Sequence, residues 1–377
     1  MVRLRGARRK AAHGRRPVFL PKARAMTSAF RVPLAPMTTL GLGGLAARVD
    51  EAFGDDDVRE SWARAARDGE PLAVLGGGSN VIAPDEGFAG TVLRIRDASV
   101  RVETAGEAVR VRVGAGLDWG ALVERACQEG WSGLECLAGI PGMVGAAPIQ
   151  NIGAYGQEVG ESIESVRFFD REVGDFVERG EDACGFGYRD SIFKRRGHAI
   201  VTEVPFRFPK TRLSKPLRYA ELTAALGCDA GASAPLATVA ATVVALRRKK
   251  GMVLDSADLD SRSAGSFFVN PILAPDALLR FREALAQAGL EPPTLFPGPR
   301  DAVKVPAAWL IERSGFAKGQ TFGAFRISAK HALALVHLGG GTASELLAVA
   351  DRIVAGVHER FGITLEREPV LLAPGAA

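Results

Sequence analysis

The sequence has few of the residues that build metal centres and disulfide frameworks. Its four cysteines, Cys127, Cys136, Cys184 and Cys228, lie far apart and form no C-x-x-C pair. Its five histidines show no ligand spacing such as H-x-x-x-H. A zinc site, a disulfide framework and any other metal centre are therefore not expected, whereas a reducing compartment such as the cytoplasm is.

A long apolar run is also absent. No stretch of eighteen or more apolar residues occurs, so the sequence predicts no transmembrane helix and no membrane partner. With 377 residues, of which 47% are hydrophobic, the chain is nevertheless long enough to bury a large core. Two or three domains are expected for this length.

Acidic residues are missing from the first 25 positions, which carry nine lysines and arginines. Without these nine cations the net charge of +5 becomes −4, so the rest of the chain is mildly acidic. The basic character therefore predicts no nucleic-acid partner for the folded body. Because the leader has no apolar segment, it is not a secretory signal, and we expect a disordered extension. A tail that binds nucleic acid or acidic lipid is the alternative.

The order of predicted elements is typical of an α+β chain. An antiparallel strand pair is expected at Val100–Glu103 and Val109–Val113, followed by a helix that Asp118 caps and Gly130 ends. Four helices are expected later, at Leu236–Lys249, Pro275–Ala288, Pro306–Arg313 and 342–360, and a final strand at Ile363–Leu372. The composition changes near residues 209–216. The expected parts are the leader (1–25), two cofactor-binding subdomains (26–96 and 97–214) and a substrate-binding domain (215–377).

A cluster of small residues follows a short apolar run at Pro71–Leu75. The cluster consists of Gly76, Gly77, Gly78, Ser79 and Asn80. Its glycines let the backbone turn several N–H groups toward one point, which suits a phosphate or pyrophosphate. The spacing is not that of a Rossmann fingerprint, and Val81–Gly87 cannot form the helix that the fingerprint requires. An ordinary turn is the alternative.

Small side chains also dominate residues 139–156, which read GIPGMVGAAPIQNIGAYG. Such a surface lets a large flat ligand approach the main chain closely and form hydrogen bonds with it. A set of tightly packed turns is the alternative. The length of the stretch favours cofactor binding.

Three separate segments carry polar side chains that are typical of catalytic sites. Arg189 offers a fork of donors to a carboxylate or phosphate, and Ser266 follows a glycine and precedes two phenylalanines. No G-x-S-x-G elbow surrounds Ser266, so a serine hydrolase is not expected. Glu368 lies near the C-terminus, from which sheet pairing can return a carboxylate to a site. The alternatives are a surface Arg–Asp pair, a turn into a strand and a solvated glutamate.

In their order, these motifs are similar to those of one family. The chain resembles UDP-N-acetylenolpyruvoylglucosamine reductases in the succession LGGGSN, IPGMVGAAPIQNIGAYG, YRDSIFK, GSFFVNP and a C-terminal LxxE. The resemblance extends from about Thr38 to Leu372. It implies an α+β fold with a two-part FAD-binding module of the vanillyl-alcohol-oxidase type and an α+β substrate-binding domain.

The resemblance implies FAD as the bound cofactor and NADPH as its reductant. The loop at 76–80 is then expected to hold the pyrophosphate, and the stretch at 139–156 to line the rest of the cofactor. The expected FAD-binding residues are Gly76, Gly77, Gly78, Ser79, Asn80, Pro141, Gly142, Gly145, Ala146, Ala147, Ile149, Gly153, Ala154 and Tyr155.

The resemblance also implies reduction of UDP-N-acetylglucosamine enolpyruvate to UDP-N-acetylmuramate in peptidoglycan precursor synthesis. Arg189 and Glu368 match the family positions that stabilise charge on the substrate carboxylate, and Ser266 matches the proton donor. Glu366 is an alternative to Glu368, because Arg367 stands where family members often carry a proline. The expected substrate-binding residues are Tyr188, Tyr219, Arg247, Lys250 and Asn270.

A monomer is expected, with the nucleotide sugar as its small-molecule partner. Two other functions stay open: another FAD-dependent oxidoreductase on the same module, and a non-catalytic binder of flavin or nucleotide sugar. An oxidase on this module would not need Arg189, Ser266 and Glu368 together. Arg247 and Lys250 alternatively complement the dipole of their helix. Residues 251–262 differ from other members of the family in length and content, so no role is assigned to them.

Overall fold

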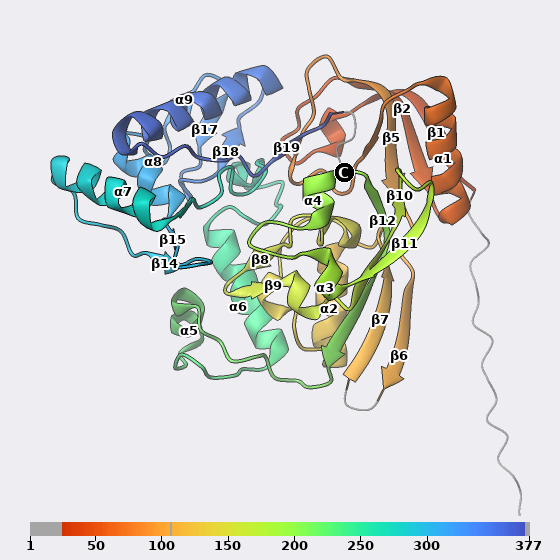
Figure 1. Cartoon of the computed structure of the whole chain (residues 1–377), viewed down its shortest axis with the longest axis horizontal. Helices are drawn as coiled ribbons and strands as arrows, with labels where there is room; N and C mark the ends of the chain where they lie inside the picture. The colour runs from red at the N-terminus through yellow and green to blue at the C-terminus, as the bar shows by residue number, and fades with distance from the viewer. Residues whose placement is uncertain (1–24, 106–107, 374–377) are drawn as a thin grey trace, which may run out of the picture.

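The computed structural model describes residues 25–105 and 108–373, which form three packed bodies (Figure 1). The leader predicted over residues 1–25 lies, except for residue 25, outside the described residues. Among the helices that are described, none combines the length and the apolar character needed to cross a membrane.

A mixed four-stranded sheet in the order β1-β2-β5-β3 forms the first body. Strands β1 and β2 are antiparallel, whereas β5 lies parallel to both β2 and β3. Apolar residues of α1 pack with β5 and with Phe169 and Ile200 of the second body, so one cluster joins the two bodies. The elements are β1 (Thr27–Pro33), η1 (Ala35–Met37), β2 (Leu45–Ala52), α1 (Asp55–Asp68), β3 (Leu72–Val74), β4 (Val81–Ile82) and β5 (Phe88–Ile95).

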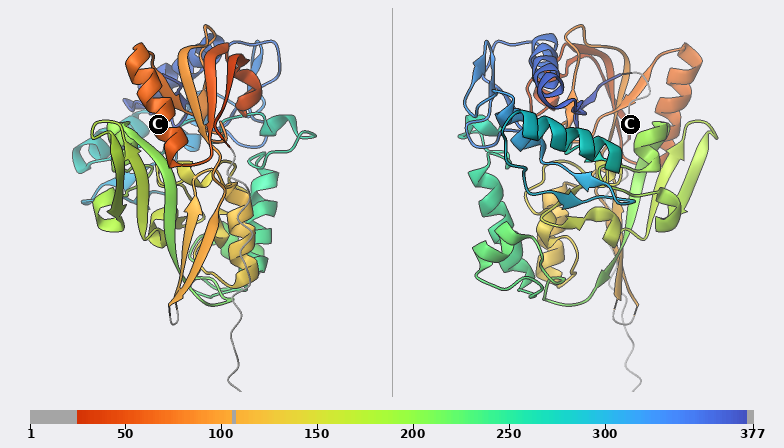
Figure 2. Two further views of the ribbon diagram at one scale, coloured as in Figure 1. Left: turned by 90° about the vertical axis from the view of Figure 1, so that its right-hand side faces the viewer. Right: turned by 60° about the vertical axis from the view of Figure 1, so that its left-hand side comes forward.

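An antiparallel five-stranded sheet in the order β11-β10-β12-β7-β6 forms the second body. The hairpin of β6 and β7 extends away from the first body (Figure 2) and confirms the predicted antiparallel pair. The strands are β6 (Val100–Ala105), β7 (Ala108–Gly114), β10 (Ser165–Asp170), β11 (Asp175–Gly180) and β12 (Ala199–Pro209).

Helix α2 (Trp119–Glu129) packs its apolar face on this sheet. The Asp118 carboxylate accepts a hydrogen bond of 2.9 Å from the N–H of Ala121, and Gly130 ends the helix at a φ of 74°, as predicted. Short elements complete the body: η2 (Glu135–Leu137), η3 (Val144–Ala146), β8 (Gly153–Ala154), β9 (Gln157–Glu158), η4 (Val159–Ser162), α3 (Glu181–Cys184) and α4 (Ile192–Arg196).

Two further helices, α5 (Ala220–Leu226) and α6 (Leu236–Lys249), also pack on the second body. Leu222 of α5 and Val239 of α6 belong to the same hydrophobic core as β7 and α2. The last domain, predicted over 215–377, therefore begins with two helices whose apolar faces lie in the core of the second body.

The third body has a core of its own, built mainly from residues 264–365. Helix α9 carries the predicted capping box, in which the Thr342 hydroxyl and the Glu345 carboxylate each accept the other's backbone N–H. Pro306 is the N-cap of α8 rather than its first helical residue. The elements are η5 (Leu259–Ser261), β13 (Ile272–Leu273), α7 (Pro275–Gln287), β14 (Phe296–Pro297), β15 (Val303–Lys304), α8 (Ala307–Arg313), β16 (Thr321–Phe322), β17 (Phe325–Ile327), β18 (Leu335–His337) and α9 (Ala343–Phe361).

The C-terminal segment returns from the third body to the first. The strand predicted over Ile363–Leu372 is wrong for most of its length, because only β19 (Val370–Leu371) is a strand, parallel to β4. The segment changes partner before β19. Phe268 and Arg367 form an isolated antiparallel bridge, and no continuous ladder connects it with β19.

Candidate active site

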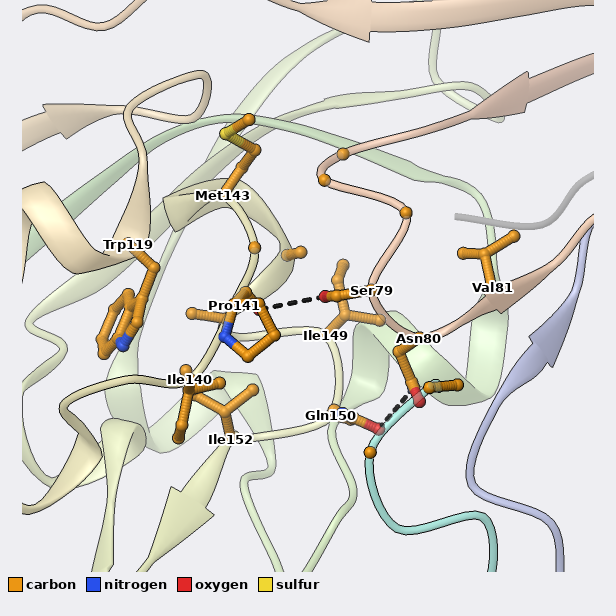
Figure 3. A pocket seen from close by; sticks show the side chains of 18 of the residues that line it. Ser79, Asn80, Val81, Trp119, Ile140, Pro141, Met143, Ile149, Gln150 and Ile152 are labelled. Atoms are coloured by element: carbon orange, nitrogen blue, oxygen red, sulfur yellow. Dashed lines mark hydrogen bonds between the residues drawn. The ribbon is translucent and has the colours of Figure 1, made fainter. Parts of the chain in front are cut away.

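One cavity is lined by residues from all three bodies. Residues 76–80, which connect β3 and β4, lie opposite residues 140–153 of the second body (Figure 3). The Ser79 hydroxyl donates a hydrogen bond of 2.9 Å to the carbonyl of Pro141, and the Asn80 amide donates one of 3.1 Å to the Gln150 side chain. The two small-residue motifs therefore form facing walls of a single site.

Glycines are required in the loop at 76–80 because the backbone passes close to its neighbours. Gly78 has a φ of 64°, and a Cβ there would lie 1.9 Å from the carbonyl oxygen of Met37. A Cβ at Gly77 would lie 2.9 Å from the Cα of Gly142 in the facing wall. Larger residues would therefore displace the loop from the position in which it lines the cavity.

The residues of the cavity fit FAD. Within the described residues, the backbone N–H groups of 76–80 donate no hydrogen bond to the protein. Because backbone donors at such a site need acceptors, phosphoryl oxygens of a bound pyrophosphate would satisfy them. The facing wall is apolar and low in bulk, and Trp119, Ile140, Pro141 and Ile149 line it (Figure 3), which suits a flat ring system.

Most of the predicted FAD-binding residues line this cavity. Two do not: Ala154 of β8 and Tyr155, which follows it, lie outside the lining. The Tyr155 ring instead forms a T-shaped contact with the Tyr219 ring, with centroids 5.2 Å apart. The remaining predicted positions line the cavity together: Gly76, Gly77, Gly78, Ser79, Asn80, Pro141, Gly142, Gly145, Ala146, Ala147, Ile149 and Gly153.

Arg189 lies in a tight turn that points its guanidinium into the cavity wall. Gly187 and Asp190 exchange two backbone hydrogen bonds, of 3.0 and 3.1 Å, so Tyr188 and Arg189 form the turn between them. Arg189 has a φ of 53°, which is uncommon for an arginine. Its Nη2 donates to the carbonyl of Gly153 at 2.8 Å, and its Nε donates to Glu368 Oε1 at 3.0 Å.

Glu368 is held beside Arg189 by backbone bonds on both sides. Its N–H donates to the carbonyl of Phe267 at 2.9 Å, and its carbonyl accepts from the Asn80 amide at 3.2 Å. Burial raises the pKa of Glu368, and the nearby Arg189 charge opposes this rise without cancelling it. The Glu366 side chain is 74% exposed and forms an ion pair of 3.8 Å with Lys194. The geometry thus favours Glu368 over Glu366 as the site carboxyl.

Ser266 is the third polar residue that lies at the cavity beside Arg189 and Glu368. It follows Gly265, which has a φ of 73°, and precedes the Phe267 carbonyl that holds Glu368. Ser266 lines the cavity together with Arg189 and Glu368. Its hydroxyl donates no hydrogen bond to the described residues, so it is free to contact a ligand.

The predicted substrate-binding residues lie in different surroundings. Arg247 lines the cavity, and burial lowers its pKa to about 10. Its Nη2 donates to the carbonyl of Met252 at 2.9 Å, while its buried Nε has no partner among the described residues. Lys250 lies outside the lining and forms an ion pair of 2.6 Å with Glu221. A ligand anion at Lys250 would therefore compete with the Glu221 carboxylate.

The other three predicted substrate residues do not line the cavity. Asn270 accepts a hydrogen bond of 2.9 Å from the N–H of Ala307 at the start of α8. Tyr188 stacks under the Lys304 ammonium, which lies 4.1 Å from the ring centroid. Tyr219 is 41% exposed and packs on Tyr155.

Several lining residues are missed by sequence reasoning. Lys194 lines the cavity and donates a hydrogen bond of 3.0 Å to the carbonyl of Arg189, and its place in the YRDSIFK motif was the available signal. Gln150 likewise lies inside a motif. Met252, Val253 and Leu254 come from the segment to which no role was assigned, and no pattern in it indicates a cavity wall.

Two protein families match the chain. The FAD binding domain matches residues 47–179, and the C-terminal domain of UDP-N-acetylenolpyruvoylglucosamine reductase matches residues 257–372. Together with the glycine-lined cavity, these matches define a flavin-binding reductase with a separate C-terminal domain.

Individual relatives extend this similarity over nearly the whole chain. The UDP-N-acetylenolpyruvoylglucosamine reductase of Thermobifida fusca is 49% identical over 353 residues, which cover 92% of this chain and 99% of the relative. That of Salinispora arenicola is 49% identical over 343 residues, covering 90% and 94%. The crystal structure of the reductase (MurB) from Thermus caldophilus has a TM-score of 0.62 and 26% identity, covering 93% and 99%.

The chain therefore belongs to the UDP-N-acetylenolpyruvoylglucosamine reductase family. The α+β fold, with an FAD-binding module ahead of a second domain, is confirmed, and so is FAD as the cofactor.

The close approach at Gly78 generates a first prediction. G78A should lower the free energy of unfolding by more than about 1–3 kcal/mol, since a positive φ alone costs that much and the clash with Met37 adds to it. G76A is the matched control, because its Cβ would lie 3.6 Å from the nearest atom, in ordinary contact. Denaturant unfolding measures both, and equal stability of the two variants would contradict the requirement for glycine.

The burial of Glu368 generates a second prediction. The ordinary pKa of a glutamate is 4.5, and burial raises it in the native chain. Between these two values of pH, the unfolded chain has lost the Glu368 proton and the native chain keeps it. The wild-type free energy of unfolding, relative to that of E368Q, should therefore fall as the pH rises through this window and level off above it.

A pH series of denaturant titrations measures this difference. E366Q, which removes an exposed carboxylate two residues away, is the matched control. A difference between wild type and E368Q that rises with pH would show that Arg189 outweighs burial.

Proposed function

We propose that this chain reduces UDP-N-acetylglucosamine enolpyruvate to UDP-N-acetylmuramate, with NADPH as the reductant and FAD as the bound cofactor, in peptidoglycan precursor synthesis. The observation that carries the proposal is the convergence of Arg189, Ser266 and Glu368 on the cavity that fits FAD. A binder without chemistry would have no need for this combination, and a flavin oxidase of alcohols or sugars has no carboxylate to hold.

The charge of the cavity supports an anionic substrate. Among the described residues that line it, the cations are Arg189, Lys194 and Arg247, and the single acid is Glu368. A buried arginine without a carboxylate, such as Arg247, favours an anion as its counter-charge. The substrate offers a carboxylate and a diphosphate, so we assign Arg189 to the carboxylate and Arg247, with Lys250, to the diphosphate.

Each catalytic residue has a distinct task in the proposal. FAD, when bound, supplies hydride chemistry at the terminal vinyl carbon. Arg189 holds the enolpyruvyl carboxylate through its planar fork. Burial raises the pKa of Glu368, and in its protonated form Glu368 would donate a hydrogen bond to the same carboxylate as negative charge develops on it. Ser266 gives its hydroxyl proton to the adjacent carbon, which must be strongly basic because serine is a weak acid.

We also propose that the chain acts as a monomer in the cytoplasm. Arg189, Ser266 and Glu368 all come from the same chain, which fits a monomer. The four cysteines are free, which fits a reducing compartment.

The visible absorption spectrum of the purified protein tests the proposed function. NADPH, added without oxygen, should bleach the flavin bands, and UDP-N-acetylglucosamine enolpyruvate should restore them. Bound flavin that this substrate does not reoxidise would favour another flavoenzyme. A protein that takes up no FAD on reconstitution would contradict the cofactor assignment.

The role of Ser266 generates a further prediction. S266A should keep flavin reduction by NADPH within about twofold of wild type and slow reoxidation by the enolpyruvyl substrate by at least 100-fold, the scale of a lost proton donor. Stopped-flow absorbance measures both half-reactions. S256A, at an exposed serine outside the cavity lining, is the control and should leave both unchanged. Normal reoxidation in S266A would refute the proton-donor role.

A further inference from the structure

Asn151 is a fully buried polar residue that the proposed mechanism does not use. Its side chain is 1% exposed, and it lies outside the lining of the cavity. It also has a φ of 46°, a left-handed conformation that asparagine tolerates better than most residues. Because Asn151 does not line the cavity, contact with a ligand does not explain why a buried amide adopts this conformation.

Every hydrogen-bonding group of the Asn151 side chain is engaged. Its Nδ2 donates to Glu158 Oε2 at 2.7 Å and to the carbonyl of Gly187 at 3.0 Å. Its Oδ1 accepts from the N–H of Gly160 at 2.9 Å. The Asn151 amide thus connects β9 and η4 with the turn that carries Tyr188 and Arg189.

The bond to Gly187 acts at the base of that turn. The Gly187 carbonyl also accepts the N–H of Asp190 at 3.1 Å, so both of its lone pairs are used. On the other side of Arg189, the Ser191 hydroxyl donates to the carbonyl of Ile149 at 2.5 Å. The segment at 149–151 therefore holds the turn before and after Arg189, and Gly153 holds the guanidinium itself.

From this arrangement we infer that Asn151 is a positioning residue for the reaction: it fixes the Gly187–Asp190 turn, so that the Arg189 guanidinium stays in place for the substrate carboxylate and for Glu368. The catalytic part of this inference rests on the proposed function. Displacement of a positioned group by about 1 Å costs about 100-fold in rate.

Two substitutions separate the side chain of Asn151 from its backbone. N151G keeps access to the left-handed conformation and removes all three side-chain bonds. N151D keeps the shape but places a carboxylate against the Glu158 carboxylate and the Gly187 carbonyl. Both should slow flavin reoxidation by UDP-N-acetylglucosamine enolpyruvate about 100-fold and leave flavin reduction by NADPH within about twofold. Equal slowing of both half-reactions would overturn the inference and indicate a general structural role.

A double-mutant cycle with R189Q tests whether Asn151 acts through Arg189. If it does, N151G should change the reoxidation rate by less than about twofold in the R189Q background, because the guanidinium it positions is already gone. A full additional loss in that background would overturn the inference. Flavin content shows that each variant folds, and if N151D fails this check, N151G carries the test.

A readout without substrate keeps this inference distinct from the proposed function. If Arg189 moves away from Glu368, its charge no longer opposes the effect of burial, and the pKa of Glu368 rises further. The difference in free energy of unfolding between N151G and the double variant N151G/E368Q should therefore level off at a higher pH than the difference between wild type and E368Q. An unchanged pH profile would overturn the positioning role. If wild-type flavin is not reoxidised by the substrate, the proposed function fails, and this pH profile still decides the role of Asn151.

Discussion

The site depends on the return of the C-terminal segment to the first body. The N–H of Val370 donates to the carbonyl of Asn80 at 2.9 Å, and that of Leu372 donates to Ile82 at the same distance. Two residues earlier, the N–H of Glu368 donates to Phe267. These bonds join the glycine loop, the serine segment and the segment that carries Glu368. Because they are backbone bonds, the side chains of Ser266 and Glu368 remain available for chemistry.

The same closure explains the raised pKa of Glu368. The backbone bonds on both sides of Glu368 fix its position beside the cavity, where its side chain is only 12% exposed. Burial disfavours the anion and Arg189 favours it, and the balance lies with burial. A neutral acid next to a fixed guanidinium can donate a hydrogen bond to a carboxylate that the guanidinium also holds. The Gly187–Asp190 turn and the returning C-terminal segment therefore create this pair.

Local signals predicted much of the fold, and long-range pairing accounts for what they missed. The caps of α2 and α9 were predictable because Asp118 and Thr342 bond to residues within one turn. The strand over Ile363–Leu372 was wrong because its pairing is set by Phe267 and by β4, far away in sequence. Lining residues in motifs were largely predicted, whereas Met252 and Val253, which follow α6, line the wall without any local pattern that indicates it.

The supports of Arg189 show how a charge can be held without being neutralised. Gly153 accepts from its guanidinium, Lys194 donates to its carbonyl, and Asn151 holds the turn at Gly187. None of these contacts brings an ionised carboxylate to the guanidinium. An additional aspartate or glutamate would hold it as firmly, but would satisfy the charge that an incoming carboxylate has to meet. Neutral acceptors and a buried amide fix the geometry, and the acid beside the guanidinium is Glu368, whose pKa burial raises.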